Sequence, residues 1–191
     1  MSPAADNTLM LKVRDGDLGK FSFLFERHHR TLFNFLLRLT GNRDLSEDLV
    51  QEVFLRMLKY RRTFRPDSQF TAWMYQVARN AHVDYFRKHK NEAPADRDAE
   101  KEDSLVEPVG PAPNPEQQFR KAQEASLVRR ALARLSLDKR EVLILSRYQG
   151  LKYEEIAAIL GCEVGTVKGR VFRAVQELGN IFFELSGEKA S

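Results

Sequence analysis

The sequence is poor in the residues that build disulfides, zinc sites and membrane-spanning helices. Cys162 is the one cysteine among 191 residues, so no disulfide can form within the chain and no Cys-x-x-Cys zinc pair exists. No apolar run approaches the roughly 20 residues that a spanning helix needs. Residues 1–17 carry charges among their apolar positions, unlike a signal peptide. These absences predict a cytoplasmic protein that is not inserted in a membrane.

The sequence also has none of the usual motifs of catalysis. It contains no phosphate-binding loop, no nucleophile motif and no carboxylate pair beyond those expected on the surface of ordinary helices. The adjacent His28 and His29 would point about 100° apart on a helix, and a third metal ligand is lacking. We therefore expect no enzyme activity, no cofactor, no small-molecule substrate and no metal site.

The charge of the chain is unevenly distributed. Hydrophobic residues make up 42% and charged residues 30%, as in an ordinary globular protein, and the formal net charge is +4. Residues 1–91 carry +6, residues 92–118 carry −6 and residues 119–191 carry +4. Two basic ends therefore flank an acidic middle. Basic bodies favour polyanions such as nucleic acid, although a surplus of this size is also common on proteins that never touch DNA.

The acidic middle is also rich in proline. Five of the seven prolines lie between residues 94 and 115, together with six aspartates and glutamates. Proline and like-charge repulsion both oppose packing and keep a segment extended. The sequence therefore predicts two folding units, 1–91 and 117–191, joined by a flexible linker at 92–116.

Both units are predicted to be helical. Apolar residues at steps of three and four begin at Phe21 and stop before Gly41, and a second stripe follows Asp44 and Glu47, an aspartate variant of the capping box. A third stripe begins at Phe70 after a proline-containing loop, and no period-two run competes, which predicts an all-α fold. After the linker we expect helices at about 117–135, 138–148, 152–160 and 164–178, with a continuation of the last one through Phe182 and Leu185 as the alternative.

Residues 150–174 have the pattern of a helix-turn-helix. The small Ala157 allows the second helix to cross closely, Gly161 tolerates the sharp turn, and Val167 and Val171 are spaced to pack inward. The start of the second helix in such a motif enters the major groove of DNA. The side chains expected to face outward there are Thr166, Lys168, Arg170 and Arg173. A helical hairpin with a solvated basic face is the simpler alternative. However, the glycine turn, the small alanine, the two valines and the positions of the cations all agree with DNA binding.

Two blocks of sequence resemble one family. GLKYEEIA and GTVKGRVFRA, at 150–157 and 165–174, look like region 4 of bacterial sigma factors of the extracytoplasmic-function (ECF) group. DLVQEVF and FRPDSQFTAWMYQVARN, at 48–54 and 64–80, resemble region 2 of the same group. The resemblance implies an alternative sigma factor that binds core RNA polymerase and directs promoter-specific initiation. A helix-turn-helix regulator with a helical sensor domain is the alternative, but it leaves the N-terminal match unexplained.

The resemblance also implies which residues bind each partner, with an anti-sigma factor as a further probable partner. The face expected to contact core polymerase contains Asp48, Gln51, Glu52 and Leu55. The residues expected to hold single-stranded DNA of the −10 element are Phe64, Arg65, Ser68, Arg79, Asn80, Arg87 and Lys88. Those expected at the −35 duplex are Thr166, Lys168, Gly169, Arg170, Phe172 and Arg173. Solvated helix surface is the competing interpretation of the polymerase face.

Aromatic residues around the central loop are expected to divide between two roles. Single strands are bound by stacking of bases on aromatic rings and by cations along the backbone. Phe70 and Trp73 share a helical stripe with Val77 and are predicted to be core. Phe64 precedes a Pro-Asp turn and is predicted to take part in a base pocket with Asn80.

Overall fold

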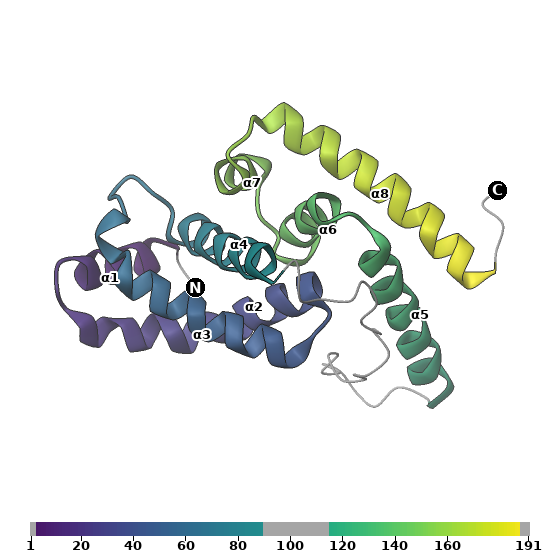
Figure 1. Cartoon of the computed structure of the whole chain (residues 1–191), viewed down its shortest axis with the longest axis horizontal. Coiled ribbons are helices and arrows are strands. Elements are labelled where there is room, and N and C mark those ends of the chain that lie inside the picture. Colours follow the sequence, from purple (N-terminus) through teal and green to yellow (C-terminus); the bar gives the residue numbers. More distant parts are fainter. Residues whose placement is uncertain (1–2, 90–114, 188–191) are drawn as a thin grey trace.

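The computed structural model describes residues 3–89 and 115–187, and the regular structure of this part of the chain is entirely helical (Figure 1). The predicted all-α fold is therefore confirmed. The predicted linker lies outside the described residues, apart from its last two residues. The helices of the first half are α1 (Pro3–Arg14), η1 (Leu18–Lys20), α2 (Phe21–Thr40), α3 (Arg43–Lys59), η2 (Arg61–Thr63) and α4 (Phe70–Lys88). Those of the second half are α5 (Pro115–Arg134), α6 (Leu137–Leu143), η3 (Ile144–Tyr148), α7 (Tyr153–Leu160) and α8 (Val164–Ser186).

The first half is a bundle in which α3 packs against both α2 and α4. The apolar stripes predicted for these helices bury a shared core, with Leu36, Val53 and Met74 fully enclosed. Helix α1, which the sequence analysis did not predict, packs on α2 and α4 and adds Met10 and Val13 to this core. Its place is fixed by polar contacts made at long range, which leave little trace in the local sequence.

The junction between α2 and α3 depends on Gly41 and Asn42. Gly41 ends α2 with φ of 67°, a left-handed conformation that costs a residue with a Cβ atom about 1 kcal/mol or more. Asn42 is the N-cap of α3, and its side-chain oxygen accepts a hydrogen bond of 2.9 Å from the Leu45 N–H. The predicted capping box of Asp44 and Glu47 is therefore wrong, because the helix begins two residues earlier than that pattern requires.

The second half contains the helix-turn-helix expected at residues 150–174. Helix α7 ends at Gly161, which has φ of 63°, and α8 begins three residues later. Val167 and Val171 are buried against the helices beneath them, as predicted. The Glu155 carboxylate accepts a hydrogen bond of 2.8 Å from the Lys152 N–H and so closes the first turn of α7. Helix α8 continues beyond residue 178 through Phe182 and Leu185, the longer of the two ends that the sequence allows, and runs along α5 (Figure 1).

A π-helical turn, η3, connects α6 to the helix-turn-helix. It is closed by a 3.0 Å hydrogen bond from the Gln149 N–H to the carbonyl of Ile144, five residues earlier. The extra residue in such a turn redirects the side chains that follow it. Here it directs Tyr148 and Gln149 toward the first half of the molecule, where they contact Arg38 and Tyr75.

The two halves, predicted as separate folding units, also pack against each other in this structure. Helix α7 lies on α4, and α2 contacts α5, α6 and η3. Arg140 of α6 donates a 2.8 Å hydrogen bond to the carbonyl of Leu39 near the end of α2. It also donates to three carbonyls at the end of α5, those of Leu132, Ala133 and Leu135.

His82 of α4 is 3% exposed and lies near this contact, with its ring against Phe86. Burial, reinforced by the positive charges of Arg140 and Arg79, lowers the pKa of His82 from 6.5 to about 4. Folding therefore holds this ring in its neutral form. Between about pH 6.5 and 4 the unfolded chain takes up a proton that the folded chain does not.

We predict that His82 makes the protein less stable as the pH falls from about 6.5 to 4, by up to about 1.4 kcal/mol per pH unit. Urea unfolding at a series of pH values would measure this. Burial raises the pKa of Glu141 and has the opposite effect on stability, so the parent must be compared with His82→Gln. The stability of the parent relative to His82→Gln should decrease toward low pH. A difference that stays constant from pH 7 to 4 would contradict the prediction.

Candidate polymerase and nucleic-acid interfaces

The outer face of α3 carries the four residues predicted to contact a partner. Asp48 and Gln51 are exposed, and Leu55 is 63% exposed although it is apolar. Glu52 lies between them and is half-buried. The face therefore combines acidic and amide groups with one accessible leucine.

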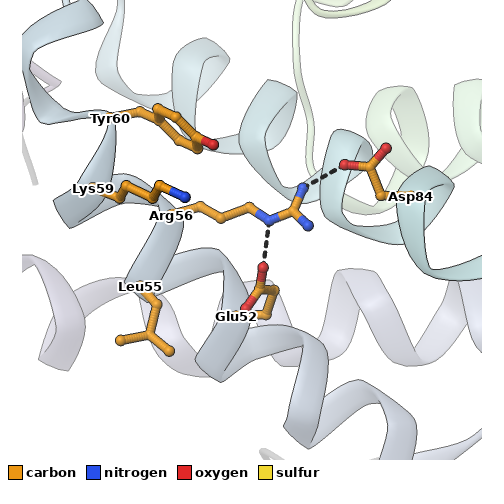
Figure 2. A pocket seen from close by; sticks show the side chains of 6 residues that line it. All are labelled: Glu52, Leu55, Arg56, Lys59, Tyr60 and Asp84. Atoms are coloured by element: carbon orange, nitrogen blue, oxygen red, sulfur yellow. Dashed lines mark hydrogen bonds and ion pairs between the residues drawn. The ribbon is translucent and has the colours of Figure 1, made fainter. Parts of the chain in front are cut away.

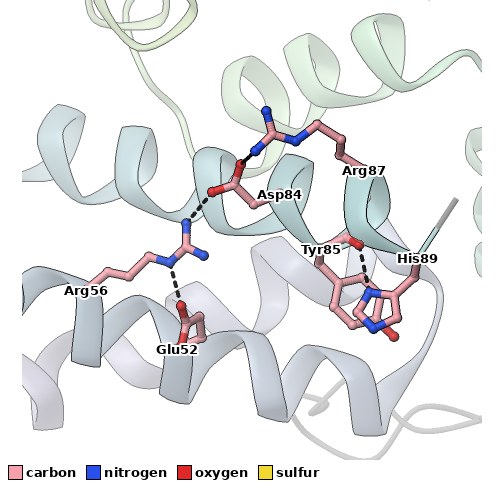
Figure 3. A network of polar contacts seen from close by, with 6 residues as sticks. All are labelled: Glu52, Arg56, Asp84, Tyr85, Arg87 and His89. Carbon is pink, nitrogen blue, oxygen red and sulfur yellow. Dashed lines mark hydrogen bonds and ion pairs between the residues drawn. The ribbon is translucent and has the colours of Figure 1, made fainter.

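Glu52 is held in place by an ion-pair network that joins α3 to α4. Arg56 contacts the Glu52 carboxylate at 2.6 Å and that of Asp84 at 2.7 Å, while Asp84 also accepts a 3.0 Å bond from Arg87 (Figure 3). The Asp84 pKa is lowered by its hydrogen bond with Arg56. Figure 2 shows Leu55 pointing away from this network, on the other side of the Glu52 side chain. The network fixes the carboxylate of the α3 face relative to the surface of α4.

Phe64 does not occupy the position that the sequence analysis gave it. Its ring is 1% exposed and packs edge-on against Trp73 at 5.4 Å and Phe70 at 6.4 Å, measured between ring centroids. The prediction that Phe64 offers an accessible ring to a base is therefore wrong, because the loop folds back and carries the ring into the core. Phe70 is buried as predicted, and Trp73 is half-buried.

The loop before α4 is fastened by a residue that the sequence analysis missed. Asn7 of α1 donates a 3.1 Å hydrogen bond to the carbonyl of Ser68 and accepts a 2.7 Å hydrogen bond from the Phe70 N–H. The second bond satisfies one of the free N–H groups at the start of α4. Ser68 is half-buried, whereas Arg65 is exposed and pairs with Asp67 on the surface. Asn7 thus holds the loop and the start of α4 in one conformation.

Asn80 lies beside a shallow hollow between α3 and α4. This hollow has a volume of about 340 Å³, and it adjoins a second hollow of about 270 Å³ that Figure 2 displays. Tyr60 borders both and is 46% exposed. The residues that line the larger hollow are Arg56, Tyr60, Val77, Asn80, Val83 and Asp84. An aromatic ring, an amide and aliphatic walls thus meet where the sequence analysis expected Phe64.

The three cations predicted along α4 differ in their surroundings. Arg87 and Lys88, near the end of the helix, are exposed. Arg79 is half-buried and contacts the Glu141 carboxylate of α6 at 3.2 Å. Arg79, which the resemblance places at the −10 strand, is thus partly covered by the second half of the chain.

The first three turns of α8 present a polar and cationic surface. Thr166, Lys168 and Arg173 are exposed, and Phe172 is 63% exposed. A Cβ atom at Gly169 would meet only the end of the Arg173 side chain, at 3.9 Å, so the backbone is open to close approach there. Arg170, predicted to face outward, is half-buried. Burial raises the pKa of Glu141, and the charge of Arg170 offsets a small part of that rise.

Other kinds of site receive no support from the described residues. Residues 3–89 and 115–187 contain no group of three or more His, Cys, Asp or Glu side chains placed to hold a metal ion. His28 pairs with Asp6 at 3.0 Å. Cys162 is half-buried and packs against the core beside the turn. Among these residues no helix is long and apolar enough to cross a membrane.

Comparison with known proteins matches both halves to one family. Residues 24–92 match Sigma-70 region 2, and residues 125–178 match Sigma-70 region 4. RNA polymerase sigma factor CarQ of Myxococcus xanthus is 33% identical over 184 residues, which are 95% of this chain and 99% of CarQ. The ECF RNA polymerase sigma-E factor of Escherichia coli is 32% identical over 178 residues, 92% of this chain and 93% of that protein.

Solved structures agree with this assignment. The sigma factor RpoE of Bartonella quintana, in complex with the anti-sigma factor NepR, has a TM-score of 0.65 and 29% identity over 84% of this chain and 95% of that chain. CnrH in complex with the cytosolic domain of CnrY has a TM-score of 0.69 and 25% identity over 97% of this chain and 99% of that chain. The chain therefore belongs to the extracytoplasmic-function group of the sigma-70 family of RNA polymerase sigma factors.

Proposed function

We propose that this sigma factor acts through three separate surfaces: the outer face of α3 for core RNA polymerase, the hollow and cations of α4 for the opened −10 strand, and the start of α8 for the −35 duplex. One observation carries the proposal. The chain contains both sigma-70 regions, region 2 followed by region 4, and the three surfaces lie on these regions. The protein is a DNA-recognition transcription factor, and on this proposal it works in the cytoplasm without catalytic chemistry of its own.

The α3 face suits a basic, helical partner surface. Asp48 offers an exposed carboxylate, Glu52 is oriented by Arg56, and Leu55 supplies an exposed apolar side chain next to Glu52. Exposed acidic groups steer a basic partner during encounter, while the buried apolar contact contributes affinity. A site of this kind on the polymerase is what the family assignment leads us to expect. An anti-sigma factor that covers this face would compete with polymerase directly.

The hollow beside Asn80 is the base site that we propose in place of one built on Phe64. Tyr60 gives an exposed ring for stacking, and the Asn80 amide offers both a donor and an acceptor to a base edge. Arg87 and Lys88 lie further along the same helix, where they can follow the phosphate backbone. The role left to Phe64 is to support the loop from within the core.

The promoter-directing function itself is tested by run-off transcription. Purified core polymerase should start at a defined promoter only when this protein is added. A transcriptional regulator with a helical sensor domain would bind duplex DNA but would neither bind core enzyme without DNA nor support promoter-specific initiation, so its behaviour would contradict the proposal.

For the α3 face, we predict that Asp48→Lys weakens the affinity for core polymerase about tenfold, which corresponds to about 1.4 kcal/mol. The reason is that a cation would then face a basic partner. Binding can be titrated by fluorescence anisotropy with the labelled sigma factor. Glu26→Lys is the matched control, since it makes the same charge reversal at an exposed position of α2. Equal affinities of the two variants would contradict the prediction and indicate that the α3 face is ordinary solvated surface.

For the −35 duplex, we predict that Lys168→Ala and Arg173→Ala each weaken binding. Loss of a phosphate contact should weaken all sequences and reduce the salt slope by about one unit, whereas loss of a guanine contact should cost about 1–3 kcal/mol at one base pair. Titrations at several salt concentrations with promoter and scrambled duplexes separate the two cases. Arg129→Ala removes an exposed cation from α5 and is the control. Variants that match this control would show that neither residue contacts DNA.

For the −10 strand, we predict that Tyr60→Ala and Asn80→Ala weaken binding to a short single-stranded −10 oligonucleotide. Stacking on one ring is worth about 1–3 kcal/mol per base, so Tyr60→Ala should lose roughly fivefold or more. Tyr60→Phe keeps the ring and should bind as the parent does if stacking is what matters. Core affinity should remain unchanged for Asn80→Ala. Full oligonucleotide binding by both alanine variants would place the base site elsewhere.

A further inference from the structure

Helix α1 lies ahead of the part of the chain that matches Sigma-70 region 2, since that match begins at residue 24. None of the three proposed surfaces includes it. Nevertheless α1 packs on α2 and α4 and also contacts η2, the short helix that leads into the loop before α4. Its polar side chains therefore lie close to the elements proposed to hold the −10 strand.

Asp6 fixes the position of α1 on α2. Its carboxylate belongs to a residue that is 8% exposed, and it pairs with Arg27 at 2.7 Å and with His28 at 3.0 Å. Such partners are needed at this depth, because burying an unpaired charge is costly. The His28 ring in turn lies 5.1 Å from the ring of Phe70, the first residue of α4, measured between centroids. Helix α1 cannot rotate or slide on α2 without separating these groups.

Asn7, the next residue of α1, uses both ends of its side-chain amide on the loop. The amide nitrogen donates to the Ser68 carbonyl at 3.1 Å, and the amide oxygen accepts from the Phe70 N–H at 2.7 Å. Within the loop, the Ser68 N–H donates to the Arg65 carbonyl at 3.0 Å, which closes a turn with Pro66 in its second position. Asn7 therefore holds the turn at the end that leads into α4.

The loop held in this way adjoins the face of α4 that carries the candidate base site. The Phe64 ring is buried against Trp73 and holds the other end of the turn, while the side chain of Arg65 is 75% exposed. Trp73, Val77 and Asn80 follow one another at helical spacing, so the loop and the hollow border the same face of α4. A single strand bound at the hollow can continue along this face to the loop.

We propose that Asn7 is a positioning residue for the −10 strand, which presets the loop at residues 65–69 so that Arg65 and the loop backbone meet a strand lying along α4. This inference rests on the proposed −10 function of α4. A preset loop binds more tightly because it loses less conformational freedom when the strand arrives. The apparent affinity falls in proportion to the fraction of molecules in which the loop is in place. Asn7 itself touches no DNA.

Two substitutions of Asn7 separate positioning from stability. Asn7→Ala removes both hydrogen bonds, whereas Asn7→Asp keeps an acceptor for the Phe70 N–H and has no donor for the Ser68 carbonyl. The negative charge of the aspartate also suits the start of α4. Asn42→Ala is the matched control, since it removes a side-chain oxygen that accepts from the first turn of α3, away from the loop. The full chain is studied by urea unfolding and by titration with single-stranded oligonucleotides, which carry the −10 strand of a promoter defined by run-off transcription or a scrambled sequence.

We expect Asn7→Ala and Asn42→Ala both to lose stability, because each leaves a backbone N–H of a first helical turn without its partner. The affinity for the −10 strand should fall only in Asn7→Ala, roughly tenfold if the loop is then in place in about a tenth of the molecules. Asn7→Asp should be closer to the parent in stability and should still bind the −10 strand several-fold more weakly. Binding of the scrambled strand should change less, since Arg87 and Lys88 still meet its backbone.

Two results would overturn the inference while leaving the proposed −10 function intact. One is an affinity for the −10 strand that stays at the parent's value in both Asn7 variants. The other is an affinity that simply follows stability, so that Asn42→Ala binds as weakly as Asn7→Ala. A parent protein that does not bind the −10 strand at all would refute the proposed −10 function, and the inference with it.

Discussion

Arg140 joins helix ends that belong to different halves of the chain, and the arrangement of the functional surfaces depends on it. The last carbonyls of a helix have no partner within the helix and must find donors when they are buried. Arg140 supplies a donor to the end of α2 and several to the end of α5. Burial lowers its pKa, but a guanidinium remains charged at any physiological pH and favours the negative ends of helix dipoles. Glu141, the next residue, is thereby directed onto Arg79.

The two candidate DNA surfaces differ in how this contact affects them. Lys168 and Arg173 lie on the outer side of α8 and are exposed while the halves are together. Arg79 lies on the side of α4 that faces the second half of the chain and is half-buried there. On the proposed assignments, duplex binding through α8 is thus compatible with the observed packing of the halves, whereas Arg79 is engaged by Glu141. The difference follows from geometry alone, because α7 packs on α4 and leaves the start of α8 free.

The sequence predicts most of the helices but less of the contacts between them. The spacing of apolar residues and the presence of turn residues can be seen within a short stretch of sequence. The all-α fold, the left-handed Gly161 and the buried Val167 could therefore be predicted. Helix α1 could not, because its buried Asp6 is explained only by Arg27 and His28, more than twenty positions away. Phe64 was misplaced for a related reason: a Pro-Asp turn predicts a loop but does not say that the loop returns its aromatic ring to the core.

The candidate surfaces also differ in whether local sequence or long-range contacts determine them. The outer face of α3 could be predicted because its four residues repeat at helical spacing within one helix. The hollow between Tyr60 and Asn80 could not, since it is formed only when the end of α3 and the middle of α4 lie side by side. The acidic, proline-rich segment predicts independent halves, but it says nothing of the surfaces that those halves present to each other. Arg79 and Glu141 are 62 positions apart, and no local pattern pairs them.

The ion-pair network also relates two of the proposed surfaces to each other. Arg56 and Asp84 connect the outer face of α3 to the side of α4 that carries Asn80, while Arg79 and His82 lie on the side that faces the second half of the chain. On the proposed assignments, a partner bound to the α3 face therefore lies next to the candidate base site and apart from the contact between Arg79 and Glu141.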